Sequence, residues 1–112
     1  MIRKYLEEIA KTTIHEDQRE ESYYPAVAEL MHDFADSINK KKISVTILPK
    51  KTEAGNPDFR VWDGENKVVG YIEAKVPETD LSKTENSEQL KRYLETFPNV
   101  ILTDFYEFRL YR

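Results

Sequence analysis

The chain has 112 residues, of which 39% are hydrophobic and 34% charged, with no cysteine and a formal net charge of −4. These values indicate one compact domain with a heavily charged surface, and they exclude a disordered chain, a disulfide scaffold and a thiolate metal site. No apolar stretch reaches the roughly 18 residues that span a bilayer. The N-terminus also lacks the apolar region of a secretory signal, so we expect a cytoplasmic protein with no membrane partner.

Two helices are expected in the first 40 residues. Ile2, Leu6 and Ile9 recur at helical spacing and predict a short helix over 2–12. A longer helix is expected from about residue 18 to 40; because proline fits only the first turn, its regular part is expected to begin near Tyr24, just before Pro25. Its apolar stripe comprises Tyr23, Tyr24, Val27, Leu30, Met31, Phe34 and Ile38.

The hydrophobic period then changes to that of strands. Alternation and β-branched residues predict three strands, over residues 43–48, 58–62 and 67–76. A polar loop over 78–87, a helix over 87–97 and one or two strands from residue 100 onwards complete the chain. The order α-α-β-β-β-α-β indicates a single mixed α/β domain over residues 1–112, with a central mixed sheet flanked by helices.

Two carboxylates and a lysine fall at the ends of the two central strands. Asp58 opens one strand, while Glu73 and Lys75 close the next and, being two residues apart, share a face. A four-residue turn between the strands pairs Asp58 with Tyr71, which makes Asp58 and Glu73 diagonal neighbours, roughly 7–8 Å apart on that face. A register slip of one residue would place them on opposite faces.

Two carboxylates at this distance can share a hard divalent cation. Mg²⁺ prefers oxygen ligands, keeps several waters and often uses one or two carboxylates, so Asp58 and Glu73 suffice. The backbone carbonyl of Ala74 is a candidate third ligand, and we expect Mn²⁺ to substitute for Mg²⁺. Such a cation promotes phosphodiester hydrolysis, in which Lys75 would orient or deprotonate the attacking water.

Pro57 and Asp58, fourteen intervening residues and then Glu73-Ala74-Lys75 resemble the motif of the PD-(D/E)XK nuclease superfamily. The resemblance implies a restriction-endonuclease-like core and a Mg²⁺-dependent endonuclease that acts on double-stranded DNA.

Two further motifs support the resemblance. Gln89 and Tyr93 form a Q-x-x-x-Y pair on the following helix, similar to one in helicase-linked and restriction-associated branches, where it supports the active site and DNA contact. The segment REESYYPAVAELM resembles the helix start in the N-terminal nuclease domains of large restriction–modification polypeptides (Type IIG and Type ISP-like). There a helix glutamate reaches toward the metal centre; Glu20 is the best positional match and Glu21 the alternative. Glu20 also fits the acidic preference of a first helical turn, and Gln89 with Tyr93 fits an ordinary helical pair.

The parent polypeptides carry methyltransferase and target-recognition regions and sometimes a helicase. The chain is therefore expected to be an excised cleavage module of a restriction system or a small stand-alone relative, and its acidic charge favours delegation of specificity to such partners. Because one centre cuts one strand, double-strand cleavage suggests a transient dimer. Two alternatives stay open: a catalytically silent nuclease-like module that binds DNA or protein, and a resolvase or repair nuclease.

Overall fold

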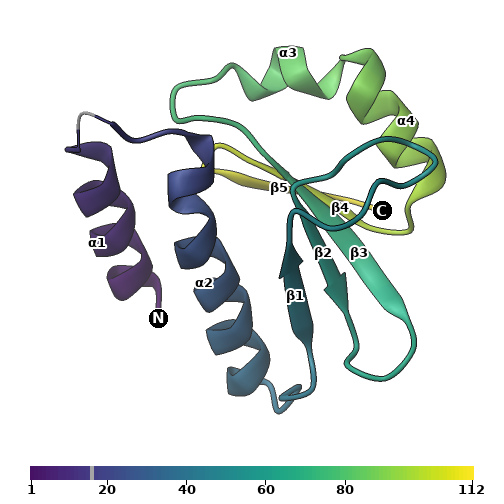
Figure 1. Ribbon diagram of the computed structural model, residues 1–112, viewed down its shortest axis with the longest axis horizontal. Coiled ribbons are helices and arrows are strands. Elements are labelled where there is room, and N and C mark those ends of the chain that lie inside the picture. The colour runs from purple at the N-terminus through teal and green to yellow at the C-terminus, as the bar shows by residue number, and fades with distance from the viewer. Residues whose placement is uncertain (16) are drawn as a thin grey trace.

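The computed structural model describes residues 1–15 and 17–112 of the chain (Figure 1). The helices are α1 (Ile2–Thr13), the 3-10 helix η1 (Glu20–Tyr23), α2 (Tyr24–Ser37), α3 (Leu81–Glu85) and α4 (Glu88–Thr96). The strands are β1 (Ser44–Ile47), β2 (Phe59–Trp62), β3 (Val68–Ala74), β4 (Val100–Thr103) and β5 (Phe108–Tyr111). The predicted mixed α/β class is thereby confirmed.

The strands form one sheet in the order β1-β2-β3-β4-β5. β3 and β4 run parallel, and the other neighbouring strands are antiparallel, so the sheet is mixed as expected. Parallel neighbours need a crossover connection, which α3 and α4 provide between β3 and β4.

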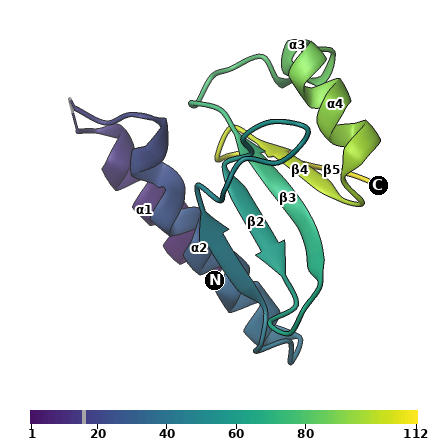
Figure 2. The same ribbon diagram turned by 45° about the vertical axis from the view of Figure 1, so that its right-hand side comes forward.

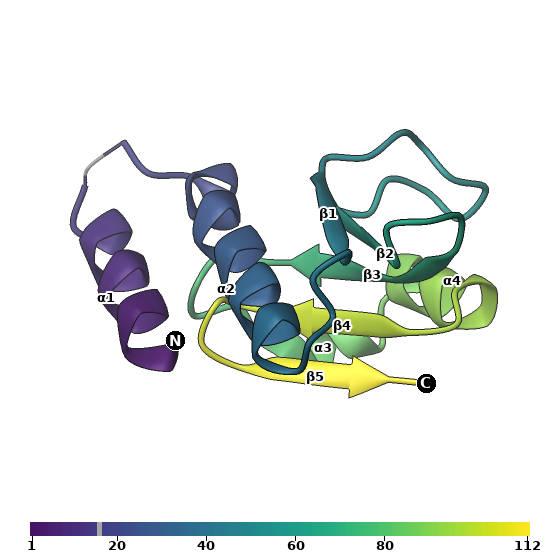
Figure 3. The ribbon, with the colours of Figure 1, turned by 90° about the horizontal axis from the view of Figure 1, so that it is seen from below.

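Helices cover both faces of the sheet (Figure 2). On β3, Ile72 and Ala74 pack into a core cluster with α1, η1 and α2, whereas Val100 and Leu102 of β4 pack into a second cluster with α4. The parallel register aligns Glu73 with Leu102, so Glu73 faces α4. On the opposite face, α1 lies beside α2 (Figure 3), and Lys4 of α1 forms an ion pair with Glu29 of α2.

The predicted long helix is divided at Tyr24. The residues from Glu20 to Tyr23 form η1, and α2 then begins at Tyr24 and ends at Ser37. Pro25 lies in its first turn, as expected, because proline has no N–H to donate to an earlier carbonyl.

The predicted apolar faces of the first two helices are only partly buried. In α1, Ile9 is buried but Leu6 is 44% exposed, because Tyr5 packs against the sheet and donates a hydrogen bond from its hydroxyl to the Phe105 carbonyl at 2.7 Å. For the second helix, the prediction that the buried stripe continues through Phe34 and Ile38 is wrong, since both side chains are half-exposed.

The C-terminal half contains one element that was not predicted, α3, and the second of the one or two strands expected from residue 100. The loop expected over 78–87 contains α3, whose first turn is capped by the Asp80 carboxylate, which accepts from the backbone N–H groups of Ser82 and Lys83. The segment from residue 100 forms two strands, joined by a turn in which Asp104 Oδ1 accepts from two backbone N–H groups.

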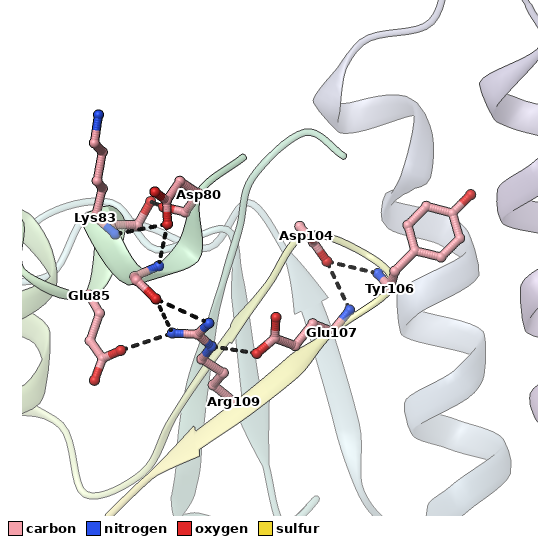
Figure 4. A network of polar contacts seen from close by, with 9 residues as sticks. Asp80, Lys83, Glu85, Asp104, Tyr106, Glu107 and Arg109 are labelled. Carbon is pink, nitrogen blue, oxygen red and sulfur yellow. Dashed lines mark hydrogen bonds and ion pairs between the residues drawn. The ribbon is translucent and has the colours of Figure 1, made fainter. Parts of the chain in front are cut away.

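Arg109 of β5 fastens α3 to the edge of the sheet (Figure 4). Its guanidinium forms ion pairs with Glu107 and with Glu85 of α3, the latter at 2.9 Å. This network fixes the segment that leads into α4, the helix of Gln89 and Tyr93.

Within residues 1–15 and 17–112, no helix combines the length and the apolar character needed to cross a membrane.

Candidate functional site

Asp58 is anchored to the end of the neighbouring strand. It immediately precedes β2, and its Oδ2 accepts a hydrogen bond from the backbone N–H of Ala74, the last residue of β3, at 2.8 Å. The Asp58 carbonyl also accepts from the Leu48 N–H at 2.8 Å, just after β1. The Ala74 N–H therefore fixes the carboxylate, and the Leu48 N–H fixes the backbone that carries it.

The strand register differs from the predicted one by two residues. Phe59 pairs with Ile72, and continued by one residue this register places Asp58 opposite Glu73 and not opposite Tyr71. The diagonal separation expected for the two carboxylates is therefore wrong.

The two-residue difference has two separate causes. Trp62 pairs with Val68, so the turn is one residue longer than predicted, and Asp63 closes it by accepting three backbone hydrogen bonds. The shift between Val61 and Trp62 leaves Val69 as an extra bulged residue, because Val61 pairs with Gly70. Either change alone would reverse the facing of Glu73; together they leave its predicted side unchanged.

Glu73 is a carboxylate enclosed by protein. The residue is only 4% exposed, and its Oε1 is buried with no hydrogen-bond partner among the described residues. Burial raises the pKa of Glu73 to about 8, and the nearby Asp58 carboxylate also raises it. A buried oxygen without a partner costs free energy, so this site favours a proton or a cation beside Glu73.

Lys75 directly follows β3 and stands beside Glu73. Its backbone N–H donates to the Thr103 carbonyl of β4 at 2.8 Å, and its Nζ lies 3.4 Å from Glu73 Oε2. The side chain is 29% exposed, so its ammonium group can meet both the carboxylate and solvent.

Glu20 approaches the same site from the other side. It is the first residue of η1, and its Oε1 accepts a hydrogen bond from the Tyr24 hydroxyl at 2.7 Å. Burial raises the pKa of Glu20, the Tyr24 hydrogen bond lowers it, and the charges of Asp58 and Lys75 act on it in opposite directions. Because Glu21 is exposed while Glu20 is half-buried, the structure favours Glu20 of the two.

Gln89 and Tyr93 belong to α4, which packs on the face of the sheet toward which Glu73 points. Gln89 Nε2 donates to the Tyr93 hydroxyl at 3.2 Å, and Tyr93 is fully buried. Burial raises the pKa of Tyr93 to about 12, and the charges of Glu73 and Asp58 add to this effect. Tyr93 therefore lies close to the carboxylate pair, whereas Gln89 contacts Tyr93.

The residues fit a cation held by two carboxylates. Among residues 1–15 and 17–112, no three His, Cys, Asp or Glu side chains are grouped closely enough to bind one ion. Mg²⁺ commonly uses one or two carboxylates and several waters, and the unpartnered oxygen of Glu73 beside Asp58 suits this case. The carbonyl of Ala74 stays a predicted ligand, while its N–H orients Asp58.

Comparison with protein-family models, curated proteins and solved structures gave no match.

Sequence reasoning assigned Tyr24 to the apolar stripe and missed its polar role. The hydroxyl of this buried residue joins Glu20, four residues earlier. The spacing of four residues was the available signal, but Glu20 lies in a 3-10 turn before α2, where the regular α-helical spacing does not apply.

Proposed function

We propose that the chain is a metal-dependent endonuclease that hydrolyses DNA phosphodiester bonds. The observation that carries this proposal is the buried Glu73 carboxylate, with one oxygen unpartnered, between Asp58 and Lys75. A structural carboxylate in such a place would normally be hydrogen-bonded on both oxygens or replaced by an apolar residue. A cation bound by this carboxylate would satisfy the unpartnered oxygen.

Each residue has a separate task in this proposal. Asp58 and Glu73 hold Mg²⁺, or Mn²⁺ in its place, and the Ala74 N–H keeps the Asp58 carboxylate turned toward Glu73. When bound, the cation supplies Lewis acidity and a water of lowered pKa. The Lys75 ammonium orients the attacking water and offsets charge that develops on the phosphate.

The acidic chain suits a cleavage module that depends on other domains. Its net charge of −4 means that the chain as a whole does not attract DNA phosphates. We therefore propose that double-stranded DNA is presented to it by target-recognition, methyltransferase or helicase regions of a cytoplasmic restriction system.

Nicking of supercoiled plasmid by the purified chain tests the proposal. We expect Mg²⁺- or Mn²⁺-dependent conversion to the open circle, reduced by at least about a hundredfold in Asp58→Ala and Lys75→Ala. Matched controls are Asp36→Ala, in the last turns of α2, and Lys67→Ala, at the opposite end of β3 from Lys75; both are exposed and should cut like the wild type.

Equal cutting by all variants, or cutting unaffected by EDTA, would contradict the proposal. DNA binding with no cleavage under any metal condition would instead favour the catalytically silent module. Preference for branched over linear duplex would favour a resolvase or repair nuclease with the same centre.

A further inference from the structure

Tyr24 is a buried side chain with its polar end at the candidate site. The residue is 2% exposed, and its ring packs against Phe59 with 4.7 Å between the ring centroids. Phe59 directly follows Asp58 in the chain. The first turn of α2 is thus fixed against the strand that carries the metal-site aspartate.

The Tyr24 hydroxyl contacts the Glu20 carboxylate, and the Asp58 carboxylate lies nearby. It donates to Glu20 Oε1 at 2.7 Å. Burial raises the pKa of Tyr24, and the Glu20 and Asp58 carboxylates near its hydroxyl raise it further. A hydroxyl has one proton to donate, and the hydrogen bond goes to Glu20.

The hydrogen bond from Tyr24 restricts the flexible side chain of Glu20. A glutamate side chain has several rotatable bonds, and holding it in one place costs conformational entropy. The Tyr24 ring is already fixed by packing, so its hydroxyl is a rigid donor that orients the carboxylate without further ordering.

We infer that Tyr24 is a positioning residue, whose hydroxyl holds the Glu20 carboxylate toward Asp58 and so adds its negative charge to the cation site. This inference rests on the proposed metal site at Asp58 and Glu73. Since the three acids are not grouped as direct ligands, Glu20 acts on the hydrated cation from outside the two-carboxylate pair.

The adjacent Tyr23 supplies a matched control. It is also 2% exposed, but its ring stacks on Phe105 at 4.6 Å and its hydroxyl pairs with Thr13 Oγ1 at 3.1 Å. Tyr23→Phe and Tyr24→Phe each remove one hydroxyl from a buried ring. Only Tyr24→Phe removes a hydrogen bond to Glu20.

Calorimetric titration with Mn²⁺ alone tests the inference. We expect Tyr24→Phe to weaken the Mn²⁺ affinity about tenfold, Glu20→Gln to weaken it by a similar factor, and the double variant to be no weaker than Glu20→Gln. Tyr23→Phe and Glu21→Gln should bind like the wild type. Thermal unfolding in EDTA, measured on each variant, separates loss of the site from loss of the fold.

The possible outcomes separate this inference from the proposed function. Wild-type affinity in Tyr24→Phe, with binding abolished in Asp58→Asn, would overturn the role of Tyr24 and leave the metal site standing. Independent, additive losses in the double variant would also overturn it, because Tyr24 would then act without Glu20. Should Tyr24→Phe be unstable, Glu20→Gln against Glu21→Gln decides whether a positioned carboxylate exists. Mn²⁺ binding unchanged in Asp58→Asn would defeat both proposals.

Discussion

At the scale of single residues, the carboxylate of Glu73 is enclosed between the sheet and α4, beside a second carboxylate at Asp58. Its pKa is raised by burial first and by Asp58 second, and Lys75 offsets only part of this. In the metal-free protein the neutral acid is therefore favoured at a pH where free glutamate is ionised. Such a group makes folding stability depend on pH.

The free energy of unfolding of the metal-free protein should fall as the pH rises from 4.5 to about 8. Below 4.5 Glu73 is protonated in both states and its contribution is fully present; above that pH only the folded state keeps the proton, until it too ionises near 8. The slope for one proton is at most about 1.4 kcal/mol per pH unit. Urea unfolding in EDTA measures it.

Glu73→Gln is the matched variant for this measurement, because glutamine keeps the shape and cannot ionise. We expect its stability to vary less with pH than that of the wild type over the same interval. Parallel curves for the two proteins would show that the buried carboxyl of Glu73 is not the group responsible.

At the scale of elements, the loop between β1 and β2 is held against α4 beside the site. Gly55 has φ +130°, and a Cβ there would stand 3.4 Å from the hydroxyl oxygen of Tyr93. Thr52 and Gly55 exchange backbone hydrogen bonds, and Arg92 Nε donates to the Ala54 carbonyl. The backbone of this loop thus covers the tyrosine that faces the carboxylates and leads directly into Asp58.

Gly55→Ala should destabilise the fold by about 1–3 kcal/mol, because residues with side chains rarely adopt this backbone conformation. Chemical denaturation at fixed pH measures the change. Glu53→Ala alters an exposed residue of the same loop and should stay within about 0.5 kcal/mol of the wild type. An equal loss of stability in both variants would show that the backbone conformation of Gly55 is not the cause.

At the scale of the whole molecule, the described residues contain the one centre proposed above and a sheet whose edge strands are β1 and β5. One centre cuts one strand, so duplex cleavage requires two visits or two copies. A transient dimer would bring two copies of the centre to the same duplex.

The rate of plasmid linearisation should therefore rise more steeply with protein concentration than the rate of nicking. Quantified gels over a series of protein concentrations, with DNA kept limiting, give the reaction order in protein for nicking and for linearisation. Linear product that forms only after nicked circles accumulate, with the same order as nicking, would show that single chains act in succession and that no dimer forms. The Asp58→Ala protein provides the background rate.

Much of the architecture could be predicted from the order of hydrophobic periods. The helix–strand pattern, the start of α2 at Tyr24 next to Pro25, and the mixed class follow from local properties of the chain. The positions of Asp58, Glu73 and Lys75 at strand ends follow as well, because the strands are recognisable and the motif falls at their limits. These features depend on interactions between residues that are close in the sequence.

The tertiary structure decided what depends on distant segments. The longer turn and the bulge at Val69 set the true register, and together they kept Glu73 on its predicted side. The burial of Glu73 arises where β3 packs against α4, and the hydrogen bond between Tyr24 and Glu20 forms where η1 leads into α2. A sequence pattern fixes the side a residue faces only for a regular strand, whereas burial and hydrogen-bond partners are decided by whatever packs against it.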